Sequence, residues 1–320
     1  MVALSTSFTP AANKLGHQRV AFVVMVALFV LAPLVVYPVF MMKVMCFALF
    51  ACAFNLLIGF GGLLSFGHAM FFGTAGYVSA YAAKVWGCTP EIAILLATVA
   101  STGLGFLTGL LAIRRQGIYF AMITLALAQM VFFFYLQAPF TGGEDGIQSV
   151  PRGKLFGLVD LNQNLTMYVL VLVVFLGGFL LIYRVVHSPF GQVLKAIREN
   201  ESRAISLGYD VDRYKLLAFV LSAGLSGLAG GTKAIVFQLA SLTDAHWSMS
   251  GEVVLMTLLG GLGTIFGPVA GAVIIVSMEN YLSQLGAWVS VVQGLIFVVC
   301  VLAFRRGVIG EIAHAIKKPL

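Results

Sequence analysis

A few polar side chains lie within or beside the long apolar runs of this 320-residue sequence, and their chemistry limits what the chain could do. Polar groups inside a bilayer rarely face lipid, so each one marks either an interhelical hydrogen bond or a solute pathway. Both alternatives stay open for these residues. His68 and Gln129 are the preferred pathway candidates because both have small neighbours that leave room. The other polar candidates are Ser65 and Glu252.

Nothing in the sequence predicts a catalytic, cofactor or metal site. Gly153-Lys154 is followed by Leu155, so the chain lacks the phosphate-binding loop of P-loop ATPases. The five histidines and four cysteines lack metal-ligand spacing. No apolar run carries the several carboxylates expected of a proton or sodium relay, which argues against an ion-driven carrier working alone.

The composition predicts a membrane protein. The chain is 60% hydrophobic and 10% charged, with a mean hydropathy of +1.01. A soluble domain is typically about half apolar and a quarter charged. The net charge of +7 comes from Lys and Arg in short breaks between apolar runs, which is typical of cytoplasmic loops rather than of nucleic-acid binding.

Ten segments are long and apolar enough to cross a bilayer, some of them barely, so we expect an all-α, polytopic transmembrane bundle of about ten spans. The first resembles a signal peptide, but no cleavage site follows it, so we expect it to be retained. The expected spans are 20–40, 43–60, 62–84, 91–113, 117–138, 167–185, 214–237, 250–265, 268–284 and 287–304. The segments 250–265 and 268–284 are either two spans or one broken, re-entrant helix.

The charge distribution predicts the orientation of the bundle. With ten spans, the Lys and Arg residues before the first span and after the fourth, sixth and tenth all fall on one side. Because positive charge marks the cytoplasmic side, we expect cytoplasmic tails at 1–19 and 305–320 around a transmembrane domain at 20–304.

Glycine is frequent, with 35 residues, and two clusters are placed one in each half of the chain. One interpretation is that small residues let helices pack closely. The other is that residues 59–67 and 260–267 unwind inside the membrane and line a pathway, as in transporters built from inverted repeats. Gly260, Gly261 and Gly263 are therefore pathway candidates.

The segment His187–Asp212 is charged and has a helical pattern. Ser188-Pro189 is a helix start, and Gly208 is a plausible stop. Apolar residues recur at a spacing of three or four, so they share one face. Such a helix either lies on the lipid surface or docks on a cytoplasmic partner, and its two glutamates favour docking.

Four blocks of the sequence resemble high-affinity branched-chain amino-acid ABC transporter permeases, of the LivM type. They occur in the family's order and cover most of residues 54–272. They are FNLLIGFGGLLSFGHAMFFGTAGYVSA (54–80), GIYFAMITLALAQM with TGGEDGI (117–130, 141–147), FGQVLKAIRENESRAISLGYDVDRYKLLAFVLSAGLSGLAG (190–230) and EVVLMTLLGGLGTIFGPVAGA (252–272).

This resemblance implies a permease subunit, not an enzyme, of an importer in the bacterial inner membrane that works by alternating access. Its implied partners are two cytoplasmic ATP-binding subunits, a second related permease and a periplasmic substrate-binding protein. It also implies that residues 189–208 form the coupling helix that contacts the ATPase. The candidate contacts are Phe190, Leu194, Ile197, Arg198, Glu199, Glu201, Arg203 and Gly208.

The resemblance leaves the substrate open among branched-chain amino acids, urea, short amides and aromatic acids, because the binding protein normally sets specificity in this class. The permease pair is either a heterodimer, which we expect, or a homodimer. The alternative function is a self-sufficient secondary carrier or channel for a small polar solute, followed by a membrane-embedded enzyme.

Overall fold

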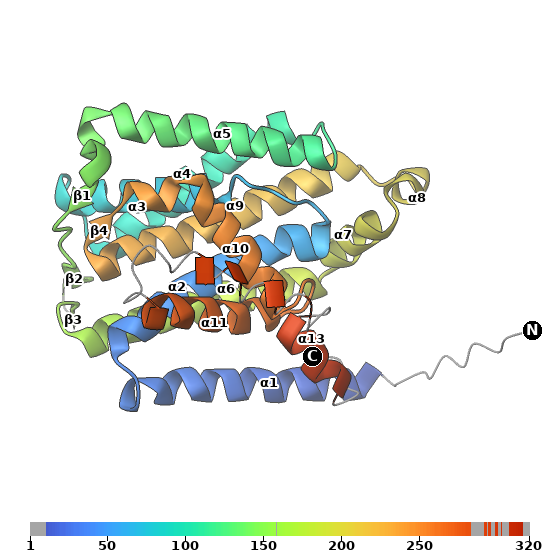
Figure 1. Cartoon of the computed structure of the whole chain (residues 1–320), viewed down its shortest axis with the longest axis horizontal. Coiled ribbons are helices and arrows are strands. Elements are labelled where there is room, and N and C mark those ends of the chain that lie inside the picture. The colour runs from blue at the N-terminus through green and yellow to red at the C-terminus, as the bar shows by residue number, and fades with distance from the viewer. Residues whose placement is uncertain are drawn as a thin grey trace, which may run out of the picture.

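The computed structural model describes residues 11–157, 159–282, 291–292, 294–295, 298–299, 302 and 307–315. Its helices run along a common axis (Figure 1). The α-helices are α1 (Ala11–Leu31), α2 (Pro38–Asn55), α3 (His68–Lys84), α4 (Pro90–Ala112), α5 (Ile118–Gln137), α6 (Asn164–His187), α7 (Pro189–Glu199), α8 (Glu201–Ser206), α9 (Val211–Phe237), α10 (Trp247–Gly260), α11 (Gly267–Leu282) and α13 (Gly307–Ala315).

Short helical turns and strands connect these helices. The turns are η1 (Ala32–Leu34), η2 (Leu56–Phe60, a π-turn), η3 (Pro139–Thr141), η4 (Gly143–Asp145) and η5 (Leu242–Ala245). Two antiparallel strand pairs gather at one end of the bundle, with α7 and α8 at the other (Figure 1). The pairs join β1 (Ile147–Gln148) to β4 (Leu239–Ala240) and β2 (Lys154–Leu155) to β3 (Val159–Asp160), so the all-α prediction missed a small strand content.

Helix starts follow simple local chemistry. Proline occupies the first helical position of α2, α4 and α7, where its missing N–H has no helical partner to lose. The Ser188 hydroxyl accepts a hydrogen bond from the Gly191 amide at 3.4 Å, which confirms the predicted cap. The predicted boundary between residues 40 and 43 is wrong, because Pro38 already begins α2.

The long helices α2 and α9, together with the shorter α3, form the centre of the bundle. In the most apolar stretch, 83% of residues are buried in α2 with η2 and 78% in α9. The corresponding shares are 33%, 28% and 39% in α4, α5 and α6, which therefore lie at the periphery. α1 lies along one side of the bundle and α5 along the opposite side (Figure 1).

Small residues bring α4 and α9 close together. A Cβ atom at Gly109 would lie 2.8 Å from the Leu216 side chain, and one at Gly231 would lie 2.9 Å from the Ala97 side chain. The glycines of each helix thus face the other helix. This is the close-packing role that the sequence offered for glycine.

Within the described residues, five helices meet the length and hydropathy expected of a membrane span, fewer than the ten predicted. They are Pro38–Phe60, Pro90–Ala112, Ile118–Gln137, Asn164–His187 and Val211–Phe237. The helices α3, α10 and α11 have 17, 14 and 16 residues. Most of the predicted span 287–304 lies outside the described residues.

Both predicted glycine breaks interrupt the helices. The chain is non-helical from Gly62 to Gly67, so the third helix starts at His68 rather than at the predicted residue 62. The second break, 261–266, separates α10 from α11. A Cβ at Gly260 would meet the backbone of Gly267, and one at Gly271 would meet that of Met256. The two helices therefore run antiparallel as a hairpin.

Candidate coupling site

The α7–α8 segment is two helices, not the single predicted one. The chain breaks at Asn200, whose backbone is extended at φ −157°. The Asn200 side chain accepts a hydrogen bond from the Arg203 amide at 3.0 Å and caps α8. In Figure 1, α8 projects beyond the end of the bundle.

The apolar face of α7 packs on this chain's own helices. Leu194 is fully buried, and the position of a Cβ on Gly61 would be 3.7 Å from its side chain. Ile197 is buried in a small cluster with Ala204 and Val211. The predicted amphipathic pattern is therefore correct, but the apolar face is covered from within the chain.

Aromatic and charged contacts also attach the hairpin formed by α7 and α8 to the rest of the chain. The Phe190 ring stacks on Tyr214, with centroids 5.5 Å apart. The Glu201 carboxylate lies 2.7 Å from the Lys215 ammonium and accepts a hydrogen bond of 2.7 Å from the Gln116 amide. Since Lys215 is only 3% exposed, Glu201 serves as its counter-ion.

Two basic residues of α7 reach the end of η2. The Lys195 ammonium lies 5.5 Å from the centre of the Phe60 ring, and partial burial lowers the pKa of Lys195 from its usual value. The Arg198 guanidinium donates a hydrogen bond to the Gly59 carbonyl. A cation at a helix C-terminus is favourable because the exposed carbonyls carry partial negative charge.

The predicted ATPase contacts therefore divide into three groups. Leu194 and Ile197 are buried against this chain. Phe190, Arg198 and Glu201 also contact it but keep exposed surface, so a contact with the ATPase stays a prediction for these three. Glu199, Arg203 and Gly208 are exposed. Two further exposed residues of this tip are apolar: Ile205 is 58% exposed and Leu207 is 70% exposed.

The two glycine breaks lie against each other. The Asn55 side chain, 2% exposed, donates to the Thr264 carbonyl at 2.8 Å and accepts from the Gly263 amide at 3.1 Å. A Cβ at Gly59 would lie 2.8 Å from the Gly263 nitrogen. Gly263 also has φ +73°, a conformation that disfavours other residues. Breaks from the two halves of the chain thus form one junction beside α7.

Two of the predicted pathway residues, Ser65 and His68, are fully buried where the first glycine break leads into α3. The Ser65 hydroxyl accepts a hydrogen bond from the Gly67 amide at 3.2 Å, which is a local turn. His68 Nε2 is 2.8 Å from the Ser222 hydroxyl, and the imidazole packs edge-on against Phe54. These surroundings favour the structural alternative for His68, an interhelical hydrogen bond.

Gln129 and Glu252 have different environments. Gln129 is half-buried on α5, and its amide hydrogen-bonds to none of the described residues. Glu252 is also half-buried, on α10, and its carboxyl interacts with that of Glu279 and more weakly with Lys43 and Asp244. A polar group without a partner is costly in lipid, so Gln129 stays the stronger pathway candidate of the two.

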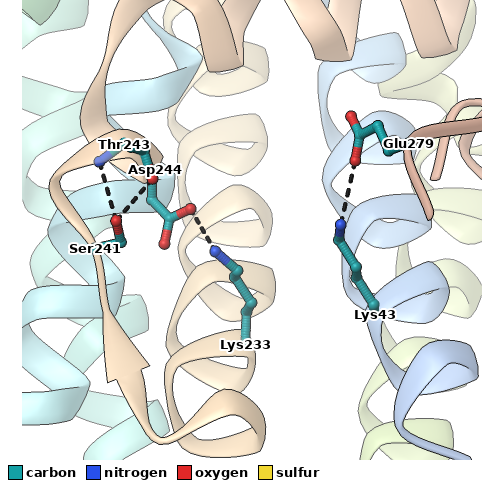
Figure 2. Close-up of polar contacts among 6 residues, drawn as sticks. All are labelled: Lys43, Lys233, Ser241, Thr243, Asp244 and Glu279. Carbon is teal, nitrogen blue, oxygen red and sulfur yellow. Dashed lines mark hydrogen bonds and ion pairs between the residues drawn. The ribbon is translucent and has the colours of Figure 1, made fainter. Parts of the chain in front are cut away.

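Two ion pairs lie near the other end of the α10–α11 hairpin, one on α11 and one on η5, the turn that precedes α10 (Figure 2). Lys43 of α2 pairs with Glu279 of α11 at 3.2 Å. Lys233 of α9 pairs with Asp244 of η5, and these two side chains are 15% and 7% exposed. No group of three His, Cys, Asp or Glu residues within the described part of the chain could hold a metal ion.

Comparison with known sequences identifies the family. The family described as "branched-chain amino acid transport system / permease component" matches residues 38–301. The chain belongs to this family. It is thus a helical membrane permease component, in agreement with the resemblance of its four blocks.

Individual relatives within this permease family are distant. The LivM proteins of Salmonella typhimurium and Escherichia coli, named high-affinity branched-chain amino acid transport system permease proteins, are 27% and 28% identical over 283 residues. Each alignment covers 80% of this chain and 65% of the relative's length. The ribose import permease protein RbsC of Bacillus subtilis is 28% identical over 239 residues, 69% of this chain and 70% of that protein. No solved structure matches the chain.

Two polar residues with structural roles, Asn55 and Lys233, belong to none of the predicted sites, although their positions in apolar helices could have drawn attention to them. Asn55 is a polar residue inside the apolar helix α2, and Lys233 is a cation near the end of α9. Both positions would cost free energy without partners, so a partner is expected. Their partners, 209 and 11 residues away, had no signal that assigned them.

Proposed function

We propose that this chain is a membrane subunit of an ATP-driven importer in the bacterial inner membrane. Separate cytoplasmic ATPase subunits would supply the energy, a second permease subunit would complete the pathway, and a periplasmic binding protein would deliver the solute. Membership of the permease family and the absence of a P-loop from the sequence support this division of labour.

The α7–α8 hairpin carries the proposal. Its inner face is anchored by Leu194, Ile197 and the Glu201–Lys215 ion pair, so it can transmit force to the bundle. At its tip, α8 projects beyond the end of the bundle (Figure 1). Arg203 and Ile205 of α8 and the following Leu207 are exposed. Exposed apolar residues ringed by charges are typical of a protein-docking surface, and the proposed occupant is the ATPase subunit.

The same proposal fixes the orientation and the mechanism. The α7–α8 end would face the cytoplasm with both chain termini, and the strand end would face the binding protein. Closure of the ATPase subunits would move α7–α8 and rock the neighbouring helices, so that the pathway opens alternately to each side. The basic residues of α7 are consistent with this orientation.

The proposed substrate is a branched-chain amino acid. The names of the LivM relatives support this assignment. A ribose import permease is similar to this chain at comparable identity, so the identities do not by themselves separate an amino acid from a sugar. The amide of Gln129, half-buried and unpaired among the described residues, is a proposed pathway contact for any of these polar solutes.

Reconstitution tests the proposal directly. Vesicles that contain this chain with its ATPase, permease and binding-protein partners should take up labelled leucine only when ATP is supplied. Uptake by this chain in vesicles without ATPase subunits would overturn the proposal.

The docking surface has its own test. Leu207→Asp should weaken capture of the ATPase subunit about tenfold or more, because it places a charge in an apolar contact. Val159→Asp is the matched control, since Val159 is 45% exposed on β3, outside the candidate spans and at the other end of the bundle (Figure 1). Equal capture by both variants would contradict docking at α8.

One observation favours the alternative of a cation-coupled carrier. Asp244, Glu252 and Glu279 come close enough to interact, although no single helix carries them all. However, Lys233 and Lys43 already pair with two of these carboxylates. Uptake driven by a proton or sodium gradient without ATP would favour the carrier.

A further inference from the structure

The junction of the two glycine breaks holds backbone groups that have no helical partner. After η2, the Gly62 amide donates to the Ile58 carbonyl at 3.1 Å and the Leu63 amide donates to the Leu57 carbonyl at 3.3 Å. These bonds leave the Gly59 carbonyl to a side-chain donor. On the second break, the Gly263 amide and the Thr264 carbonyl lie outside any helix. Gly59 is buried and Gly263 and Thr264 are half-buried, so these backbone groups are withdrawn from water and require partners.

Asn55 satisfies both groups of the second break. One amide side chain, at the last residue of α2, donates to Thr264 and accepts from Gly263. The geometry resembles a backbone pairing, in which the turn 261–266 is held at a fixed position relative to α2. Because Asn55 is buried, water does not compete for these bonds.

Arg198 satisfies the first break from the other side. Its guanidinium donates to the Gly59 carbonyl, and its Cγ would lie 3.0 Å from a Cβ on Gly62. Its Nη1 would also lie 3.2 Å from a Cβ on Gly263, as would the Gly59 carbonyl oxygen. The Arg198 side chain therefore touches both breaks at once.

One face of α7 carries these contacts. Leu194 packs beside Gly61, and Arg198 follows one helical turn later beside Gly62. A rigid shift of α7 therefore displaces residues 59–62, and Gly59 in turn contacts Gly263. Packed elements that hold each other in this way move between discrete arrangements rather than deforming gradually.

We propose that Arg198 and Asn55 are positioning residues that act as one clamp, which makes the conformation of the turn 261–266 depend on the position of α7. The clamp rests on the proposed function, because there the ATPase moves α7. It adds to that function a defined route, from α7 through Gly59 to the hairpin of α10 and α11. The turn is then the moving part that opens the pathway on the α7 side.

Hydrogen exchange tests the clamp without relying on transport. In the purified full chain, Asn55→Leu should speed exchange in the peptide that contains Gly263 about tenfold, because its amide loses its acceptor. Arg198→Met should speed exchange in the same peptide, although Arg198 bonds to no amide there. Arg213→Met is the control, since Arg213 is 83% exposed and pairs locally with Asp210.

Coupling in the assembled transporter gives the second readout. Arg198→Met and Asn55→Leu should each lower leucine uptake per ATP hydrolysed about tenfold while ATPase binding is kept, within the usual range of coupling between sites. The double variant should be no worse than the poorer single variant, because both act through one unit. Arg198→Lys retains a donor and should recover part of the coupling.

These outcomes separate the clamp from the proposed function. If the wild-type complex shows no ATP-dependent uptake, the importer proposal fails, and exchange in the chain alone still decides the clamp. Wild-type exchange around Gly263 in Arg198→Met, or additive losses in the double variant, would overturn the clamp. If Arg198→Met does not fold, the milder Arg198→Lys variant is measured by the same exchange assay.

Discussion

The α10–α11 hairpin is held differently at its two ends. At the α7 end, Asn55 and Arg198 bond to backbone groups, and Gly59 touches Gly263. Toward the strand end, Lys43 pairs with Glu279 of α11, and Lys233 pairs with Asp244 of η5, just before α10 (Figures 1 and 2). Backbone contacts allow almost no displacement, whereas a lysine can change rotamer and follow a moving partner.

This difference suggests a division of roles within the hairpin. The backbone-held end is beside α7, where the proposed force arrives, so a precise contact transmits displacement. At the ion-paired end, α11 stays attached to α2, and η5, which leads into α10, stays attached to α9 while that displacement occurs. Substitutions at the two ends should therefore differ in kind: loss of stability at the ion pairs and loss of coupling at the backbone junction.

The largest loss of stability is expected at the more buried ion pair. Lys233→Met leaves the Asp244 carboxylate without a cation in an apolar environment and should lower the free energy of unfolding by about 3–5 kcal/mol. Lys233→Met combined with Asp244→Asn should regain much of this loss. Unfolding of the purified protein in detergent measures both, and equal losses in the single and double variants would contradict the argument.

A methyl group at the backbone junction should have the next largest effect. Gly263→Ala places a Cβ 3.2 Å from Arg198 Nη1 and forces φ +73° on alanine, at a cost of about 1–3 kcal/mol. Gly251→Ala on α10 is the control, because nothing lies within 4 Å of its Cβ position. The control should leave the free energy of unfolding unchanged or raise it by about 0.5–1 kcal/mol. An equal loss in both variants would show that the junction is not closely packed.

Sequence patterns predicted the parts of this comparison that depend on local chemistry. Apolar runs, prolines and the Ser188 cap indicated most helices, and the glycine clusters indicated both breaks. The amphipathic pattern of α7 indicated an apolar face, but periodicity cannot distinguish cover by the same chain from cover by a partner. The family resemblance named Leu194 and Ile197 as candidate ATPase contacts, and in this structure both side chains are buried against their own chain.

Contacts between distant segments could not be predicted in the same way. Asn55 and Gly263 are 208 residues apart, and any buried donor and acceptor would satisfy an asparagine. The same holds for Lys43 and Glu279, which the sequence places near separate span ends, where each could reach water. Only the packing of the helices selects these partners.

Substitutions in the Lys43–Glu279 ion pair should lower stability less than those in the buried pair, and the loss should differ between the two partners. Lys43→Met leaves Glu279 beside Glu252 without a nearby cation and should cost about 1 kcal/mol, less than the buried pair because these side chains are 31% and 21% exposed. Glu279→Gln should cost less, since it removes a carboxylate next to Glu252 and frees Lys43 to approach Glu252. Detergent unfolding at neutral pH compares the two, and a larger loss in Glu279→Gln would contradict this order.

The smallest effect on stability is expected at the exposed tip of the α7–α8 hairpin, where substitutions should change only the binding of the ATPase subunit. Glu199→Lys and Arg203→Glu alter exposed charges, so the free energy of unfolding should stay within about 0.5 kcal/mol of the wild type. Their affinity for the ATPase subunit should fall, and it should fall more at low salt, because screening weakens interactions between exposed charges. Binding measured at two salt concentrations tests this. A salt-independent loss accompanied by destabilisation would place these residues with the inward-facing anchors of α7 instead.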